Sequence, residues 1–147
     1  MIFNPDYLRF ISLLNKHVVA YLIVGGYAVN YHGYVRSTFD LDVWVNNTNK
    51  NIQRLIAAIE EFGYDANKLK SISFKDTIVF HFGDEKQKIE ILSQIIGVSF
   101  DDADSKKEVI TIENVVISIL DLNSLLRNKL LSGRYKDWDD YEKLTSE

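Results

Sequence analysis

The segment FDLDVWV at residues 39–45 constrains the fold more than any other stretch of this chain. Its side chains alternate in character, which is typical of a β-strand with one face in a hydrophobic core. Aspartate is disfavoured in strands, so two aspartates in such an apolar segment stand out. One face is predicted to carry Phe39, Leu41, Val43 and Val45, and the other Asp40, Asp42 and Trp44.

Asp40 and Asp42 share one face of this predicted strand, with Cα atoms about 6–7 Å apart. Unpaired carboxylates at that spacing repel each other and raise each other's pKa, whereas a divalent cation such as Mg²⁺ would keep both ionised. Two interpretations therefore stay open. The pair is either the solvated face of an amphipathic strand or part of a metal site.

Length and composition limit the classes of protein to consider. The 147 residues fit one domain, 1–147, with a single core. The absence of cysteine excludes disulfides, thiolate nucleophiles and cysteine-bound zinc, and a net charge of -4 argues against a protein that coats nucleic acid. No secretory leader and no apolar run of about 20 residues is seen, so we expect a cytoplasmic protein with no membrane partner.

Periodicity, helix caps and turn residues predict a mixture of helices and strands. Helices are expected at residues 5–16, 27–32, 48–62, 121–132 and 136–145. Strands are expected at residues 20–24, 39–45, 76–82 and 87–92, with a further hairpin in 108–119 around Glu113-Asn114. This mixture predicts an α+β fold.

The apolar run at residues 20–24 ends in Gly25-Gly26, just before the short predicted helix. Glycines at a strand-to-helix turn let the backbone approach a ligand closely, and free N–H groups at the helix start suit a phosphate. Arg36 and Thr38 then add a cation and a hydroxyl before Asp40. A Gly-Gly pair alone is often only a tight turn, so the combination is what favours a nucleotide site.

Taken together, these motifs resemble the polymerase beta-like nucleotidyltransferase superfamily. The matching segments are Val24-Gly25-Gly26, Asp40-Leu41-Asp42 and Ile89-Glu90-Ile91. The chain looks most like the small stand-alone bacterial members, some of which belong to toxin–antitoxin or abortive-infection systems. An arginine shortly before the paired acids and a C-terminal pattern fit that type, here Arg36, Lys129, Gly133-Arg134 and Lys136-Asp137.

This resemblance implies an α+β nucleotidyltransferase fold, a mixed sheet of about five strands flanked by about five helices. It implies transfer of a nucleoside monophosphate from a nucleoside triphosphate to a hydroxyl of RNA, protein or a small molecule, with release of pyrophosphate. Asp40, Asp42 and Glu90 would be the catalytic residues and would bind one or two Mg²⁺ ions. The nucleotide-binding residues would be Gly25, Gly26, Arg36, Thr38, Lys129, Arg134 and Lys136.

Two positions depart from the pattern of the more active branches of the superfamily. Gly26 stands where many members have a serine, and Glu90 stands where many small members have an aspartate. An alternative function is therefore a catalytically weak binding module, an antitoxin-like partner of another protein. A divalent-metal hydrolase on another scaffold is a third hypothesis, but it explains neither the Gly-Gly turn nor Lys129.

Lys129 is unusual because it falls on the apolar stripe of its predicted helix. It either reaches a phosphate across a cleft or extends past the helix end to bond the terminal carbonyls. Asp137 is expected to pair with Lys129 or Arg134. Two further side chains are weaker candidates: Trp44, for stacking a base or for packing, and His81, expected diagonal to Glu90 across a hairpin.

Overall fold

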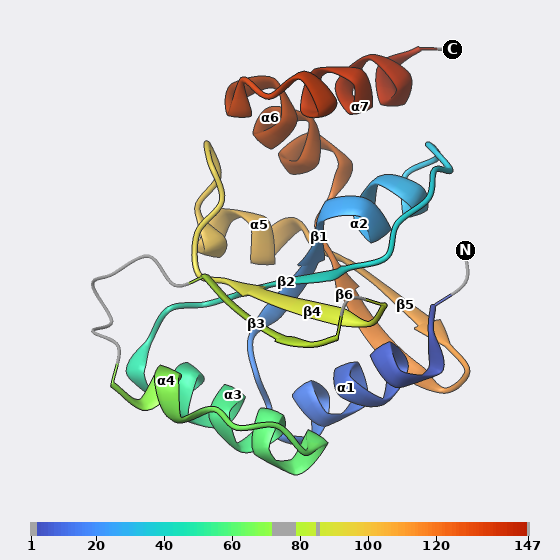
Figure 1. Cartoon of the computed structure of the whole chain (residues 1–147). Helices are drawn as coiled ribbons and strands as arrows, with labels where there is room; N and C mark the ends of the chain where they lie inside the picture. The colour runs from blue at the N-terminus through green and yellow to red at the C-terminus, as the bar shows by residue number, and fades with distance from the viewer. Residues whose placement is uncertain (1–2, 72–78, 85, 147) are drawn as a thin grey trace.

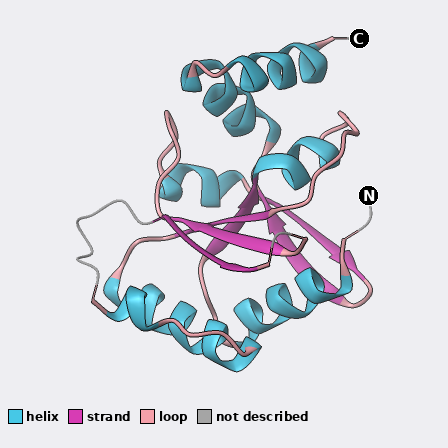
Figure 2. Cartoon of the chain, viewed as in Figure 1, coloured by secondary structure: helices cyan, strands magenta, loops and turns pink. Residues whose placement is uncertain are grey.

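The computed structural model describes residues 3–71, 79–84 and 86–146, and within them it contains seven helices and one sheet of six strands (Figure 1, Figure 2). None of the described helices combines the length and the apolar character that a bilayer crossing needs. The helices are α1 (Pro5–Lys16), α2 (Gly25–Tyr31), α3 (Asn49–Phe62), α4 (Asn67–Lys70), α5 (Phe100–Lys106), α6 (Leu122–Ser132) and α7 (Tyr135–Thr145). The strands are β1 (Tyr21–Val24), β2 (Leu41–Val45), β3 (Val79–Gly83), β4 (Lys88–Leu92), β5 (Glu108–Ile112) and β6 (Val115–Ile119).

Capping residues explain where the main helices begin and end. The Asn4 side chain accepts a hydrogen bond from the Asp6 N–H, and a proline occupies the first turn of α1. Thr48 caps α3 in the same way, and α3 ends at Gly63 in the left-handed conformation. These bounds confirm the helices predicted at 5–16 and 48–62 to within a residue.

The sheet has the strand order β3-β4-β2-β1-β6-β5. β1 runs antiparallel to β2 and parallel to β6, while β2 runs parallel to β4. The outer strands belong to two antiparallel hairpins, β3–β4 and β5–β6. The sheet is therefore mixed, as expected for the α+β class, and β2 lies near its centre with β1 and β4 on either side.

Helices cover both faces of this sheet (Figure 1). α1, α3 and α4 lie on one side, and α2, α5, α6 and α7 lie on the other. On the first face, aromatic rings of α1 and α3 meet Phe82 of β3. Leu41, Val43 and Val45 of β2 are completely buried, which confirms the predicted core face of that strand from residue 41 onward.

The structure corrects the sequence predictions at several places. β2 begins at Leu41, so Phe39 lies before the strand and is 71% exposed instead of buried. Trp44 is buried edge-on against Phe100, so the base-stacking alternative is wrong. Helices α4 and α5 were not predicted because both are short and each buries one side chain, Leu69 or Ala103. Residues 76–78 of the predicted strand 76–82 lie outside the described residues.

Candidate active site

Asp42 lies at the centre of the polar group predicted from the sequence. In the sheet it is paired with Val24 of β1 on one side and with Glu90 of β4 on the other. Because β2 and β4 are in register at this pair, Asp42 and Glu90 present their carboxylates on the same face of the sheet. Asp40 precedes β2 by one residue, so the three predicted acids meet where β2 begins and β1 ends.

Asp42 carries the most perturbed carboxylate of the three. Burial raises its pKa, and the charges of Glu90 and Asp40 raise it further, to about 7. Lys129 and Lys88 act in the opposite direction but do not cancel the effect. The Lys88 ammonium also lies 3.4 Å from the Asp40 carboxylate at the rim. Negative charge is therefore crowded around Asp42, and a bound cation would relieve that crowding.

The donor set fits Mg²⁺ that arrives with a phosphate ligand. In the described part of the chain, no three histidine, cysteine or acidic side chains stand close enough to form a complete metal cluster. Mg²⁺ commonly uses only one or two protein carboxylates and completes its shell with water and substrate phosphates. Asp40 and Asp42 can supply those carboxylates, and Glu90 is the adjacent third acid.

Gly25 and Gly26 allow the start of α2 to approach the acids. Gly25 has a φ of +66°, and a Cβ there would lie 2.0 Å from Asp42 Oδ2. A Cβ on Gly26 would lie 2.2 Å from Thr38 Oγ1. No side chain fits at either position. The Thr38 hydroxyl therefore occupies the space that a side chain at position 26 would need.

Two cavities meet at Asp42 and together contain all ten residues predicted for the site. The larger has a volume of about 430 Å³ and combines polar groups with an apolar wall of Leu92, Ile95 and Ile96. The smaller has a volume of about 180 Å³. Of the predicted residues, Gly25, Glu90, Lys129 and Arg134 line the larger cavity, Gly26, Arg36, Thr38, Asp40 and Lys136 line the smaller one, and Asp42 lines both.

The predicted cations Lys129 and Arg36 are bound to carboxylates of α7. The buried Lys129 ammonium lies 2.8 Å from Asp137 and 3.1 Å from Asp140. Arg36 donates two hydrogen bonds to Asp140, at 2.9 and 3.0 Å. The pair with Asp137 was expected from the sequence, whereas the pair of Lys129 with Asp140 was not. The network joins α6, α7 and the segment before β2 at the edge of both cavities.

Asp137 pairs with both partners expected from the sequence. Burial alone would raise the pKa of its carboxyl, but hydrogen bonds from Lys129, Ser132 and Arg134 outweigh burial and hold the pKa at about 2. The Arg134 guanidinium donates to Asp137 at 2.6 Å and stays largely exposed. Lys136 makes no ion pair within the described residues and lines the smaller cavity.

Two residues near the acids were not predicted correctly from the sequence. His81 is exposed and lies directly opposite Glu90 in the β3–β4 pair, so its predicted diagonal position is wrong by two residues of register, although the two residues share a face as expected. Tyr7 was not identified at all, although its hydroxyl donates to the carbonyl oxygens of Phe39 and Lys88 beside the site. The sequence did contain a signal for this contact. Tyr7 lies on the apolar stripe of its helix, and a buried tyrosine hydroxyl needs a hydrogen-bond partner.

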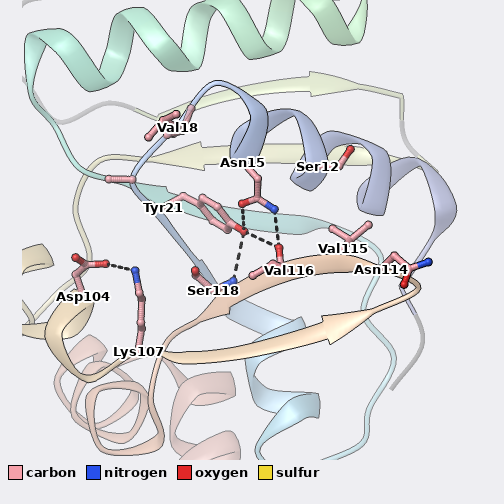
Figure 3. A pocket seen from close by; sticks show the side chains of 12 residues that line it. Ser12, Asn15, Val18, Tyr21, Asp104, Lys107, Asn114, Val115, Val116 and Ser118 are labelled. Atoms are coloured by element: carbon pink, nitrogen blue, oxygen red, sulfur yellow. Dashed lines mark hydrogen bonds and ion pairs between the residues drawn. The ribbon is translucent and has the colours of Figure 1, made fainter.

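A larger cavity, of about 640 Å³, lies at the opposite end of β1 and contains none of the predicted residues (Figure 3). Its polar groups bond to one another and to β6. Tyr21 donates toward Asn15 and the Val116 carbonyl and accepts from the Ser118 N–H. Asp104 and Lys107 form an ion pair at its edge. Volume alone does not make this cavity the better candidate, because its lining includes one carboxylate, that of Asp104, which is paired with Lys107.

Comparison with solved structures identifies the fold. A Thermotoga maritima protein described as a candidate nucleotidyltransferase superimposes with a TM-score of 0.66, at 16% identity, over 97% of this chain and 94% of the other. The lincosamide antibiotic adenylyltransferase LnuA, solved with lincomycin, gives 0.61 at 16% identity over 99% and 98%. ANT(2″)-Ia, solved with adenylyl-2″-tobramycin, gives 0.53 at 10% identity over 92% and 83%.

No protein-family model matches the sequence, and neither does any curated protein. The likeness is thus one of three-dimensional structure, over nearly the whole length of this chain. The chain has the nucleotidyltransferase fold, and the fold expected from its motifs is confirmed.

Proposed function

We propose that this chain is a Mg²⁺-dependent nucleotidyltransferase, which transfers a nucleoside monophosphate from a nucleoside triphosphate to an acceptor hydroxyl. The observation that carries the proposal is the position of Asp42, a carboxylate with a raised pKa where two cavities meet. Transfer between two substrates needs a point where both can meet. Carboxylates at that point can hold a metal ion, which in turn binds the phosphates. The fold of the chain supports the same assignment.

The two cavities suggest how the substrates divide between them. The smaller cavity offers the Thr38 hydroxyl, the Lys136 ammonium and Gly26 beside Asp40, which suits phosphate groups. The larger cavity contains Glu90 and would receive the acceptor. Mg²⁺ held by Asp40 and Asp42 would neutralise charge on the phosphates.

Glu90 would then act as the general base of the reaction. Its carboxylate accepts the proton of the acceptor hydroxyl while that oxygen forms a bond to the α-phosphorus. The bond between the α-phosphorus and the bridging oxygen breaks, and the electron pair leaves with pyrophosphate. Arg36 and Lys129, both held by Asp140, line the cavities and would be fixed in position beside the phosphates.

A small molecule is the acceptor class that we propose among RNA, protein and small molecules. A cavity of about 430 Å³ with an apolar wall lies within the usual range for small-molecule sites. The net charge of -4 disfavours a long polyanionic acceptor. The LnuA and ANT(2″)-Ia structures contain lincomycin and adenylyl-2″-tobramycin, which supports the same class.

The first prediction concerns nucleotide binding and transfer. Mg²⁺ with each of the four ribonucleoside triphosphates should bind the protein, and pyrophosphate should be released when an acceptor is present. Asp40→Asn combined with Asp42→Asn should weaken Mg²⁺-dependent nucleotide binding by about 100-fold, because both carboxylate charges are lost. Binding is measured by calorimetry, and pyrophosphate by a coupled assay with lincomycin, tobramycin, tRNA and a protein extract as acceptors.

Asp104→Asn is the matched control, because Asp104 is an acid at the distant cavity. It should leave nucleotide binding unchanged. Binding that persists in the double variant would contradict the metal site. Binding by the unmodified chain without transfer to any acceptor would instead favour the antitoxin-like binding module.

A further inference from the structure

A buried hydroxyl from the first helix reaches the start of two strands that carry the acids. The Tyr7 side chain of α1 is buried, with the residue only 1% exposed. Its hydroxyl lies 2.5 Å from the carbonyl oxygen of Phe39 and 3.1 Å from that of Lys88. Phe39 directly precedes Asp40, and Lys88 begins β4 two residues before Glu90.

These carbonyls lie where the ladder between β2 and β4 begins. The first paired residues of that ladder are Leu41 and Ile89, so Phe39 and Lys88 come before it. Asp40 also lies outside β2, and its ion pair with Lys88 is 3.4 Å long and well exposed. Exposed pairs of this kind contribute little to holding a side chain. The Tyr7 hydrogen bond is therefore the main buried anchor next to Asp40.

The position of the Tyr7 hydroxyl is itself well defined. The Tyr7 ring packs edge-on against Tyr27 of α2, with centroids 5.9 Å apart. Burial, followed by the charges of Tyr27, Asp40, Asp42 and Asp84, raises the pKa of Tyr7 well above its usual value. The hydroxyl consequently stays protonated and remains a hydrogen-bond donor throughout the pH range in which the protein would work.

We infer that Tyr7 is a positioning residue of the proposed active site, whose hydroxyl sets the position of Asp40 relative to Asp42 and Glu90. This inference rests on the proposed function. Tyr7 lines neither of the two cavities that meet at Asp42. It acts through the backbone of Phe39, because a free start of β2 would let the Asp40 carboxylate move away from the Asp42 carboxylate. Two carboxylates bind one cation well only when their oxygens converge.

The test compares two tyrosine-to-phenylalanine substitutions that each remove a buried hydroxyl from a backbone carbonyl. Tyr7→Phe removes the bonds to Phe39 and Lys88. Tyr21→Phe is the control, because the Tyr21 hydroxyl also lies near a carbonyl, that of Val116, but at the distant cavity (Figure 3). Mn²⁺ binding in the presence of ATP is followed by electron paramagnetic resonance, which needs no acceptor, and thermal unfolding is recorded for each protein.

Tyr7→Phe is expected to weaken Mn²⁺ binding about fivefold, the effect of one hydrogen bond, and excess Mn²⁺ should restore occupancy. Tyr21→Phe is expected to lower thermal stability by a similar amount but to bind Mn²⁺ like the unmodified protein. Equal Mn²⁺ affinity of Tyr7→Phe and the unmodified protein would overturn the inference, and so would equal weakening in both variants. An unmodified protein that binds no Mn²⁺ with ATP would overturn the proposed function and the inference with it.

Discussion

At the scale of single residues, ionisation of the Asp42 carboxyl carries an energetic cost. Burial and the charges of Glu90 and Asp40 all disfavour the ionised carboxylate of Asp42. The charges of the nearby lysines do not cancel these effects. An isolated structural aspartate would gain nothing from such a position. The cost is understandable if a cation that binds together with the nucleotide offsets the charge of the Asp42 carboxylate.

The Asp42 carboxyl should make stability depend on pH. Its pKa is 3.8 ordinarily and about 7 in the folded protein, so between these values the folded state binds more protons than the unfolded state. Stability attributable to this group therefore falls as pH rises from about 4 to about 7. Asp42→Asn should raise the free energy of unfolding at pH 8 by about 2 kcal/mol, with no gain at pH 4.

Urea denaturation at pH 4 and pH 8, in a chelator, measures this difference. Asp104→Asn is again the control and should change stability little at either pH, because its carboxylate is exposed and its ion pair is superficial. A stability gain for Asp42→Asn that is the same at both pH values would show that the Asp42 pKa is not raised by folding.

At the scale of secondary-structure elements, α7 is attached to the molecule mainly through carboxylates. Its buried residues are Asp137 and Asp140, whereas Trp138 and Tyr135 are 53% and 88% exposed. Asp140 receives Arg36 and Lys129, and Asp137 receives Lys129, Ser132 and Arg134. Ion pairs with this many hydrogen bonds fix orientation well, so α7 should hold the cationic side chains at the edge of both cavities in place.

Asp137→Asn should destabilise the protein by about 3 kcal/mol at pH 7, because it leaves the buried Lys129 ammonium with one carboxylate. The folded pKa of Asp137, about 2, is below its ordinary 3.8. The stabilisation is therefore present above pH 4 and is lost as pH falls toward 2. Denaturant unfolding of the variant and the unmodified protein at pH 7 and pH 3 measures the difference, which should shrink at the lower pH.

Asp139→Asn provides a control on the same helix, because Asp139 is exposed and accepts a hydrogen bond from the Tyr34 hydroxyl, itself at the surface. Its effect should stay within about 0.5 kcal/mol. If Asp137→Asn were equally mild, the ion pairs of α7 would contribute nothing net, and its attachment would have to be apolar.

At the scale of the whole molecule, we propose that residues 1–147 act as one domain. One sheet runs from β1 to β6, and the candidate site draws on residues from Gly25 near the first strand to Lys136 in the last helix. Removing either end of the chain would thus remove part of the site. The small acceptor class that we propose agrees with a domain this compact.

The net charge of -4 leads to a prediction about nucleic acid. A labelled 20-nucleotide single-stranded RNA should bind more weakly than about 100 μM at 0.15 M salt, because few phosphates can be neutralised. Arg36 and Lys129, which line the cavities, are already paired with carboxylates. Fluorescence anisotropy measures the affinity, with ATP and Mg²⁺ as the positive control. Micromolar RNA binding that weakens steeply with salt would contradict the small-molecule acceptor and favour RNA.

Much of the fold was predictable because its signals are local. Caps and periodicity are contained in short stretches, so α1, α3 and β2 were found close to their true bounds. The short helices α4 and α5 were missed because one buried residue in each produces no periodic pattern. Phe39 was placed in the core because alternation alone does not show where a strand begins.

The members of the site were predictable from the sequence, but their pairing was predictable only in part. By itself the sequence determined the acids, the glycine turn and the cations, since their spacing along the chain is itself the signal. Only the tertiary structure decided that Asp140 binds both Lys129 and Arg36, that His81 lies directly opposite Glu90, and that Tyr7 reaches the start of β2. The physical reason is that these contacts depend on strand register and helix packing across long stretches of chain, which no local pattern encodes.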